Sequence, residues 1–257
     1  MKTTIAMLAI TLLIPIAAAQ VEKPDPSTRY QKLLDEVKAD QARHQKEQMD
    51  KFKKWNEAGK EGPAPAFMMR APIDEFITKF RKAAKDYGGT DDCVRFHVWV
   101  VEYALRTDED AALQSLDVVM AKHITSKDLG GVARALPQYV GHLQRDGVAD
   151  HFDRILEKNP HAPVQALALY HRAKSAANRV RVGSEDWRVV KKELLRAKKL
   201  TDDQDLARQI QSLITDRENL RVGGMAPEIK GKDLDGVAFK LSDYRGKIVV
   251  LDFWGHW

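Results

Sequence analysis

Residues 222–257, VGGMAPEIKGKDLDGVAFKLSDYRGKIVVLDFWGHW, decide how the chain is divided, because the pattern of side chains changes where this stretch begins. Upstream of Val222 apolar residues recur at helical spacing, and downstream the pattern is typical of strands. Asp235 and Gly236 lie between two short strand-like runs, which predicts a hairpin because glycine accepts the positive φ angle of a tight turn. The apolar run 248–251 predicts a strand buried on both faces, at the centre of a parallel sheet.

Residues 73–221 are expected to form a helical domain, so the predicted fold class is mainly α. Short helices joined by short turns must bury their apolar stripes against neighbours, which favours an array of antiparallel helix pairs. No repeat of fixed period occurs, and the pattern therefore does not indicate a solenoid. The expected helices cover residues 73–87, 91–105, 109–123, 129–143, 148–157, 164–177, 186–199 and 202–219.

The stretch before this domain predicts one long helix between two connectors. Residues 20–26 are polar and proline-containing, which is typical of a linker, and Ser27 is the expected N-cap of a long polar helix over residues 27–58. Glycines and prolines then predict a second, flexible linker over residues 59–72. The long helix is interpreted as a solvated, charged helix that packs at its ends, and a coiled-coil or partner-binding helix is the alternative.

Residues 1–19 have the pattern of a secretory signal peptide. Lys2 supplies the positive charge, residues 5–16 are apolar, and small residues up to Ala19 predict cleavage after it. A retained membrane anchor is the alternative, but the apolar run is shorter than the roughly 20 residues that a spanning helix needs, and Pro15 interrupts it. We therefore expect an exported protein, periplasmic or secreted, with no stable membrane span after signal cleavage.

Charge and cysteine content exclude several classes of function. The 42 basic and 37 acidic residues are well mixed, so no basic block indicates nucleic-acid binding. The single cysteine, Cys93, excludes an internal disulfide. Cys93 and His97 share one face of an expected helix, but a zinc site usually needs three or four protein ligands. We therefore expect a buried, apolar cysteine, no metal site and no cofactor.

The motif blocks of the C-terminal stretch resemble a known family. Residues 226–229, 233–236, 241–247 and 248–257 occur in the order found at the start of exported thioredoxin-like proteins. These are the disulfide reductases of the TlpA and ResA type, with the alkyl hydroperoxide reductase group as a relative. The resemblance implies that residues 222–257 supply the first hairpin and central strand of an incomplete thioredoxin-like α/β domain. It also implies a Cys-x-x-Cys motif directly after Trp257, so that the chain is C-terminally truncated before its reactive cysteines.

The resemblance also implies roles for three residues. A thiolate at the start of the next helix is stabilised by the helix dipole and attacks a disulfide, and the second cysteine must lose a proton to resolve the mixed disulfide. Asp252 occupies the position of the buried proton acceptor in that family. Trp254 would pack beneath the site, and Trp257 would lie beside the first cysteine. His256 occupies a variable position, and we assign it no role.

The resulting hypothesis is a thiol-disulfide oxidoreductase of the cell envelope whose clients are protein disulfides or dithiols. As this fragment it is expected to be inactive, because the Cys-x-x-Cys motif is missing. Its helical region is expected to position the redox domain or recognise the client. The alternative is a helical interaction scaffold with a vestigial redox segment.

Overall fold

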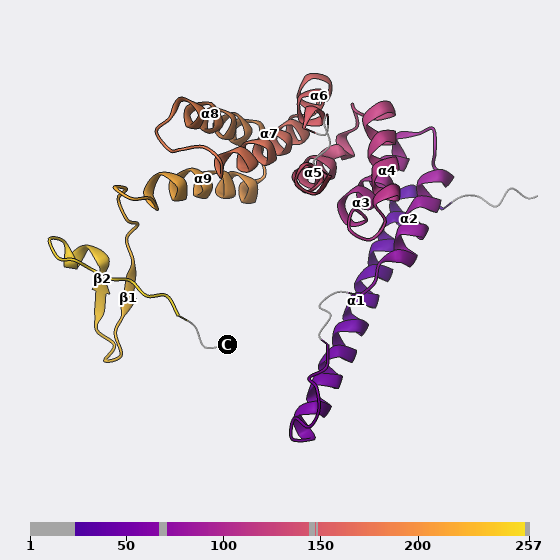
Figure 1. Ribbon diagram of the computed structural model, residues 1–257. Helices are drawn as coiled ribbons and strands as arrows, with labels where there is room; N and C mark the ends of the chain where they lie inside the picture. The colour runs from indigo at the N-terminus through magenta and orange to yellow at the C-terminus, as the bar shows by residue number, and fades with distance from the viewer. Residues whose placement is uncertain (1–23, 67–70, 144–146, 148, 255–257) are drawn as a thin grey trace, which may run out of the picture.

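The computed structural model describes residues 24–66, 71–143, 147 and 149–254 of the 257-residue chain (Figure 1). This part is mainly helical, which confirms the predicted class. The helices are α1 (Pro26–Glu57), α2 (Asp74–Asp86), α3 (Val94–Tyr103), α4 (Glu109–Lys122), α5 (Gly130–Leu143), α6 (Asp150–Lys158), α7 (Ala162–Ala177), α8 (Glu185–Leu200) and α9 (Gln204–Asn219). Short 3₁₀ turns are η1 (Asp91–Cys93), η2 (Lys127–Leu129) and η3 (Leu241–Tyr244), and two strands are β1 (Lys230–Lys232) and β2 (Ala238–Lys240).

The start of α1 differs from the expectation that Ser27 caps it. Asp25 is the N-cap, and its Oδ2 accepts a hydrogen bond from the Thr28 backbone N–H at 2.8 Å. Pro26 takes the first helical position, where its missing N–H costs nothing. The hydrogen bond from Thr28 also holds the pKa of Asp25 below its ordinary value. The prediction was wrong because the proline was assigned to the linker rather than to the helix.

The two halves of α1 have different surroundings. Near its N-terminus Leu33 is fully buried, and the Tyr30 ring meets the edges of Phe80 and Phe96. The C-terminal half extends away from the other helices, as Figure 1 shows. Met49 and Phe52 are exposed there. The long solvated helix is thus anchored at one end.

The segment after α1, which the sequence predicts to be a linker, forms hydrogen bonds with that helix. The Trp55 indole N–H donates to the Gly62 carbonyl at 3.3 Å. Further along, the Gln41 side chain forms two hydrogen bonds with the Ala71 backbone, accepting from its N–H at 3.0 Å and donating to its carbonyl at 3.4 Å. The described parts of residues 59–72 therefore run back along α1.

Helices α1 to α6 and the start of α7 share one hydrophobic core. At its centre the Phe80 ring stacks on Trp99, with ring centroids 3.9 Å apart. Tyr139 is fully buried, and its hydroxyl donates to the Val101 carbonyl at 2.8 Å. Burial raises the pKa of Tyr139 well above its ordinary value, so this hydroxyl remains a donor.

Helices α7, α8 and α9 enclose a second core. Small buried side chains on α7, among them Ala166 and Ala173, let α8 approach closely. Trp187 of α8 is buried, and its indole N–H donates to Glu218 of α9 at 3.2 Å. Lys191 pairs with the same carboxylate at 2.6 Å. Neighbouring helices pack pairwise across both cores, which fits the expected array of helix pairs.

Asn159, in the turn between α6 and α7, joins that turn to the one after α4. Its side-chain amide donates to the carbonyls of Ile124 at 2.7 Å and Ser126 at 2.8 Å. Its Oδ1 accepts from the His161 backbone N–H at 2.9 Å. Because Asn159 is buried, these bonds replace the water that its amide would otherwise bind.

Strands β1 and β2 form the expected antiparallel hairpin, with Lys230 opposite Lys240 and Lys232 opposite Ala238. The expected central strand at residues 248–251 is not formed, and Ile248 is 100% exposed. A strand of this kind needs partners on both sides. Within the described residues the hairpin is the only sheet, and it offers residues 248–251 no pairing. The parallel sheet of a thioredoxin-like domain is therefore absent from this part of the chain.

Candidate functional site

The hairpin loop is organised by one carboxylate. The Asp233 Oδ1 accepts hydrogen bonds from the backbone N–H groups of Asp235 at 3.0 Å and Val237 at 2.8 Å. The Gly236 N–H donates to the Asp233 carbonyl at 3.0 Å, and Gly236 has a φ of 82°. This left-handed conformation closes the loop at low cost only with glycine or asparagine. The sequence predicted the hairpin from Asp235 and Gly236, but the organising carboxylate belongs to Asp233.

The hairpin also anchors the chain that follows it. Phe239 covers Gly231 on the opposite strand, where a Cβ atom would lie 3.0 Å from the phenyl ring. The Leu241 N–H donates to the Ile229 carbonyl at 2.8 Å. The Glu228 carboxylate accepts from the Ser242 N–H at 2.9 Å, and hydrogen bonding by the Ser242 side chain and backbone lowers the pKa of Glu228. The first three motif blocks, residues 226–229, 233–236 and 241–247, therefore belong to one local hydrogen-bonded unit.

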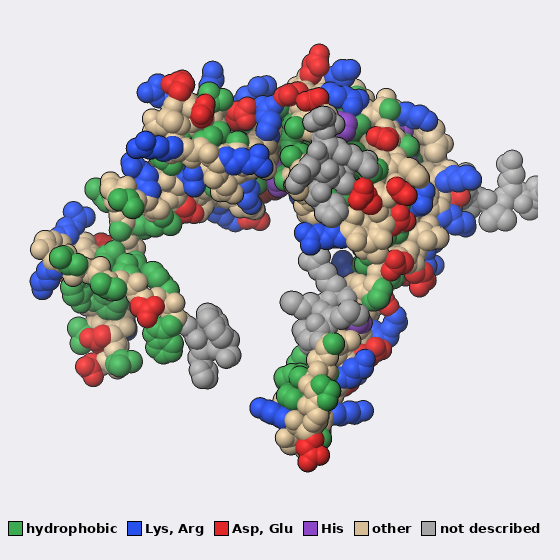
Figure 2. Space-filling model, in the orientation of Figure 1, with side chains coloured by type: hydrophobic (Ala, Val, Ile, Leu, Met, Phe, Trp, Pro, Cys, Tyr) green, Lys and Arg blue, Asp and Glu red, His purple; other side chains and the backbone are tan. Residues whose placement is uncertain are grey.

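The residues assigned to the redox site lie beyond this unit, in a segment without regular structure. Asp252 is exposed, and Trp254 is 83% exposed. Trp257 lies outside the described residues. Figure 2 shows hydrophobic side chains gathered over the C-terminal segment on the visible face. Of the three predicted site residues, the structure therefore places only Asp252 and Trp254, both in the exposed segment, and the predicted site stays a prediction.

The buried environment expected for Asp252 is absent. The resemblance implied a carboxylate enclosed in a sheet, but no strand forms at residues 248–251 and no described element covers the segment. The proton-acceptor role implied by the resemblance depends on burial of the carboxylate. Its role as a proton acceptor therefore stays a prediction that depends on a completed domain.

Cys93 is buried between η1 and α3, as the sequence led us to expect, but its neighbour is not His97. The Cys93 sulfur lies 3.5 Å from Nε2 of His123, and Nδ1 of His123 lies 3.5 Å from Oδ1 of Asp91. Burial raises the pKa of the Cys93 thiol, and the nearby Asp91 carboxylate adds to this. The thiol is therefore kept protonated and is a poor nucleophile. No spacing in the sequence indicates the contact with His123, which depends on how α4 ends.

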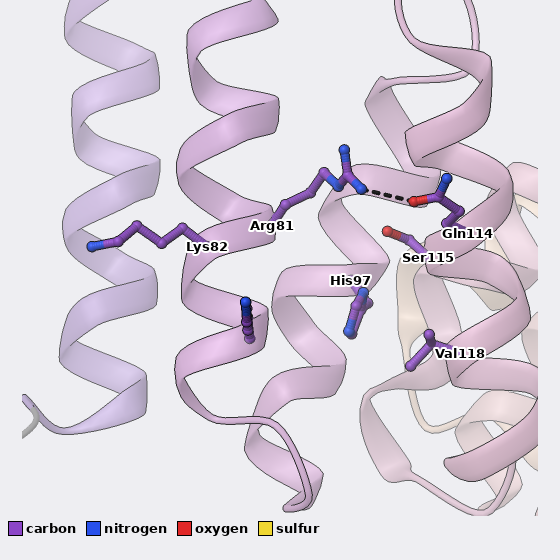
Figure 3. A pocket seen from close by; sticks show the side chains of 7 residues that line it. Arg81, Lys82, His97, Gln114, Ser115 and Val118 are labelled. Atoms are coloured by element: carbon purple, nitrogen blue, oxygen red, sulfur yellow. Dashed lines mark hydrogen bonds between the residues drawn. The ribbon is translucent and has the colours of Figure 1, made fainter.

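His97 instead faces a hollow between α2, α3 and α4, of about 400 Å³ (Figure 3). Arg81 of α2 reaches across it and donates to the Gln114 side chain of α4 at 2.7 Å. Burial, with smaller contributions from His123 and Arg81, lowers the pKa of His97 to about 4. The imidazole is therefore neutral at physiological pH. Sequence reasoning did not find this hollow, because its residues come from three separate helices.

The described part of the chain contains neither a cluster of metal-ligating side chains nor a membrane-spanning helix. Among those residues no group of three or more His, Cys, Asp or Glu side chains is placed to hold a metal ion. None of the helices described is both long and apolar enough to cross a bilayer.

Comparison with known proteins gives short matches to one group of enzymes. The chain is 44% identical over 46 residues to the thiol-disulfide oxidoreductase ResA of Geobacillus thermodenitrificans. It is 46% identical over 46 residues to ResA of Geobacillus kaustophilus, and 40% identical over 47 residues to ResA of Bacillus anthracis. No family model matches the chain, and no solved structure does.

Each match covers 18% of this chain, and the chain spans about a quarter of the length of these relatives, 26% or 27%. These matches support a thioredoxin-like relation and, at most, a function related to thiol-disulfide exchange. The relation is partial, so the activity of the relatives does not by itself become the activity of this chain.

Proposed function

We propose that this chain is part of an exported thiol-disulfide oxidoreductase of the TlpA and ResA type, in which residues 222–257 begin the redox domain. The observation that carries the proposal is the similarity to the ResA oxidoreductases. We assign the matched stretch to the C-terminal residues, because the motif blocks of that family occur there in order. The helical region is proposed to position the redox domain or recognise its client.

The proposed reaction uses a cysteine pair that follows Trp257. One thiolate attacks a client disulfide and forms a mixed disulfide, releasing one client thiolate. The second cysteine, after losing its proton to Asp252, attacks the mixed disulfide and releases the second client thiolate. The client is reduced by two electrons and the cysteine pair is oxidised to a disulfide. The clients are therefore proteins that carry disulfides or, in the reverse direction, dithiols.

The given chain is proposed to be inactive in this reaction. It contains a single cysteine, Cys93, whereas the exchange needs two thiols close together. Cys93 is also buried, and its thiol pKa is raised. Its sulfur is therefore unavailable as a substitute nucleophile.

Export is proposed from residues 1–19, whose positive start, apolar stretch and small residues are typical of a signal peptide. A periplasmic or secreted location would place the redox domain in a compartment where disulfides persist. Mass determination of the mature protein tests this, and a mature chain that begins at Gln20 is the expected result.

The experiment for the activity starts from the reading frame that follows the Trp257 codon. We expect it to encode Cys-x-x-Cys and the rest of a thioredoxin-like domain, and the extended protein should reduce insulin. The Asp252→Asn variant should be slower and lose one ionisation from its pH profile, whereas Asp235→Asn, in the hairpin loop, should behave as the wild type. Insulin turnover by the 257-residue chain above that of its Cys93→Ser variant would contradict the proposal.

A helical interaction scaffold is the second candidate, and one observation favours it. The C-terminal half of α1 extends into solvent and exposes Met49 and Phe52, which a partner could cover. In that case the redox segment is vestigial. A stop codon directly after Trp257 would favour the scaffold over the oxidoreductase.

A further inference from the structure

The hollow between α2, α3 and α4 has polar groups from all three helices on its walls. Arg81 and Lys85 come from α2, His97 from α3, and Gln114 and Ser115 from α4. Figure 3 shows Arg81, His97 and Ser115 around one space. The hollow lies away from the C-terminal segment to which the redox function is assigned, so it needs an explanation of its own.

One nitrogen in this hollow has no partner. Nδ1 of His97 is shielded from solvent and forms no hydrogen bond with any described residue. A buried polar atom without a partner costs free energy, and native structures rarely leave one unless a ligand or water completes it. The imidazole is neutral at physiological pH, because burial lowers the pKa of His97 to about 4. In the tautomer with its proton on Nδ1, this nitrogen is a donor without an acceptor among the described residues.

A hydroxyl lies close to the same space. Ser115 is only 2% exposed, although serine is usually found at the surface. Figure 3 shows its hydroxyl directed toward the space between Arg81 and His97. A hydroxyl can donate to an anion at little cost, since its hydrogen rotates freely.

The charges around the hollow are positive. The Arg81 guanidinium is oriented by its hydrogen bond to Gln114, which leaves further N–H groups free to bind a ligand. Lys85 adds a second positive charge to the wall, and no carboxylate lines the hollow. Lys82 also borders the hollow, but in Figure 3 its ammonium group points away from Arg81 and His97, so it is not among the groups that hold the anion. The combination of an oriented guanidinium with hydroxyl and imidazole donors suits an oxyanion.

We propose that this hollow binds a small oxyanion, a phosphate or carboxylate group, held by Arg81 and Lys85 and completed by the donors of His97 and Ser115. Binding turns the His97 ring, so that Nδ1, shielded in the structure described, meets a ligand oxygen as its acceptor. The site is independent of the redox segment and is present in the chain as given.

The test titrates the full chain with inorganic phosphate and, separately, with acetate at constant ionic strength. Binding is followed by calorimetry and by the NMR signals of the His97 ring. We expect saturable binding of at least one anion, and a rise in the pKa of His97 from about 4, because a bound negative charge favours the protonated ring. Saturation by phosphate alone would assign the site to phosphoryl groups, and saturation by acetate alone to carboxylates.

Two variants on the same helix separate a built site from general surface charge. Arg81→Gln and Lys82→Gln each remove one positive charge from an exposed position of α2. Arg81→Gln should weaken binding by about tenfold or more, because it removes a charge-assisted hydrogen bond. Lys82→Gln should leave the affinity within about twofold, as for an exposed charge without a direct contact.

Ser115→Ala is a third variant, which removes the hydroxyl and leaves the charge of the hollow unchanged. It should weaken binding by several-fold while the helical circular dichroism stays that of the wild type. The proposal is overturned if neither anion saturates, or if Arg81→Gln and Lys82→Gln weaken binding equally.

Discussion

The helical region and the C-terminal segment use their apolar residues in opposite ways. In the helical region the apolar stripes are enclosed in two cores, and large side chains such as Phe80 and Ile210 are fully buried. In the C-terminal segment residues of the same kind, including Leu234 and Ile248, are fully exposed. The difference does not come from composition. It comes from the different partners that a helix and a strand need in order to fold.

A helix satisfies its backbone hydrogen bonds within itself and needs a neighbour only for its apolar face. In this protein that neighbour is usually the next helix in the sequence, as for α3 and α4 or α7 and α8. A central strand needs partners for its backbone as well, and parallel partners come from distant parts of a chain. The hairpin forms because its two strands are adjacent in sequence. Residues 248–251 stay unpaired because no described strand lies beside them.

The largest expected effect on stability comes from a large side chain in the core that α1 to α6 share. Phe80→Ala removes a buried ring that stacks on Trp99, and should lower the free energy of unfolding by about 3–5 kcal/mol. Leu234→Ala changes a fully exposed residue of the C-terminal segment and should alter it by less than about 0.5 kcal/mol. Urea unfolding followed by circular dichroism compares them. Equal losses would show that the segment is packed in solution.

Removing the Asn159 side chain should have the next largest effect. Asn159→Ala leaves the buried carbonyls of Ile124 and Ser126 without their donor, at a cost of about 1–3 kcal/mol. Asn56→Ala, at an exposed position near the end of α1, is the control and should unfold at the wild-type urea concentration. If the two variants matched, the link between the turns would contribute nothing to stability.

Acid should destabilise the helical region through its half-buried histidines. Burial lowers the pKa of His171 from 6.5 to about 4, so below pH 6.5 the unfolded state binds a proton that the folded state does not. The free energy of unfolding should therefore fall as the pH falls from 6.5 toward 4, and His97 acts in the same direction. His171→Gln should flatten this dependence in unfolding measured between about pH 7.5 and about pH 5.5, one pH unit to either side of the pKa of an ordinary histidine. The exposed control His161→Gln should keep the wild-type slope, and an unchanged slope in His171→Gln would contradict the assignment.

The smallest expected effect is confined to the hairpin. Asp233→Ala removes the carboxylate that accepts from the N–H groups of Asp235 and Val237. The NMR shifts of residues 230–240 should move toward random-coil values, while the global free energy of unfolding changes by less than about 0.5 kcal/mol. Asp235→Ala leaves those bonds in place and should keep the hairpin shifts. A global loss of stability in Asp233→Ala would mean that the hairpin supports the helical cores.

Much of the helical region could be predicted from sequence, because helical periodicity is a local signal. The expected helix at 109–123 is observed as Glu109–Lys122, and the one at 73–87 as Asp74–Asp86. The exact ends of the helices are harder to predict. At the start of α1, Asp25 and Ser27 are both good N-caps, and only the hydrogen bond from Thr28 to Asp25 distinguishes them. The division of the chain into domains at residues 59–72 and 222 stays a prediction.

The candidate site could be predicted only in part. The hairpin follows from the residues around Gly236, but the exposure of residues 248–254 depends on partners that no local pattern reveals. The contact between Cys93 and His123 joins η1 to the end of α4, and the hollow at His97 joins three helices. Such contacts depend on tertiary packing, and the four-residue spacing of Cys93 and His97 indicates neither of them.

The anchored and projecting halves of α1 also bear on how the molecule moves in water. The helix has 32 residues, which at about 1.5 Å per residue makes it about 48 Å long. A compact globule of this chain length would have a radius of gyration of about 18 Å. Only the C-terminal half of α1, about 24 Å at the same rise, projects from the core. A projecting rod increases friction more than it increases mass. The protein should therefore tumble anisotropically and migrate in gel filtration ahead of a globular protein of the same 29.1 kDa.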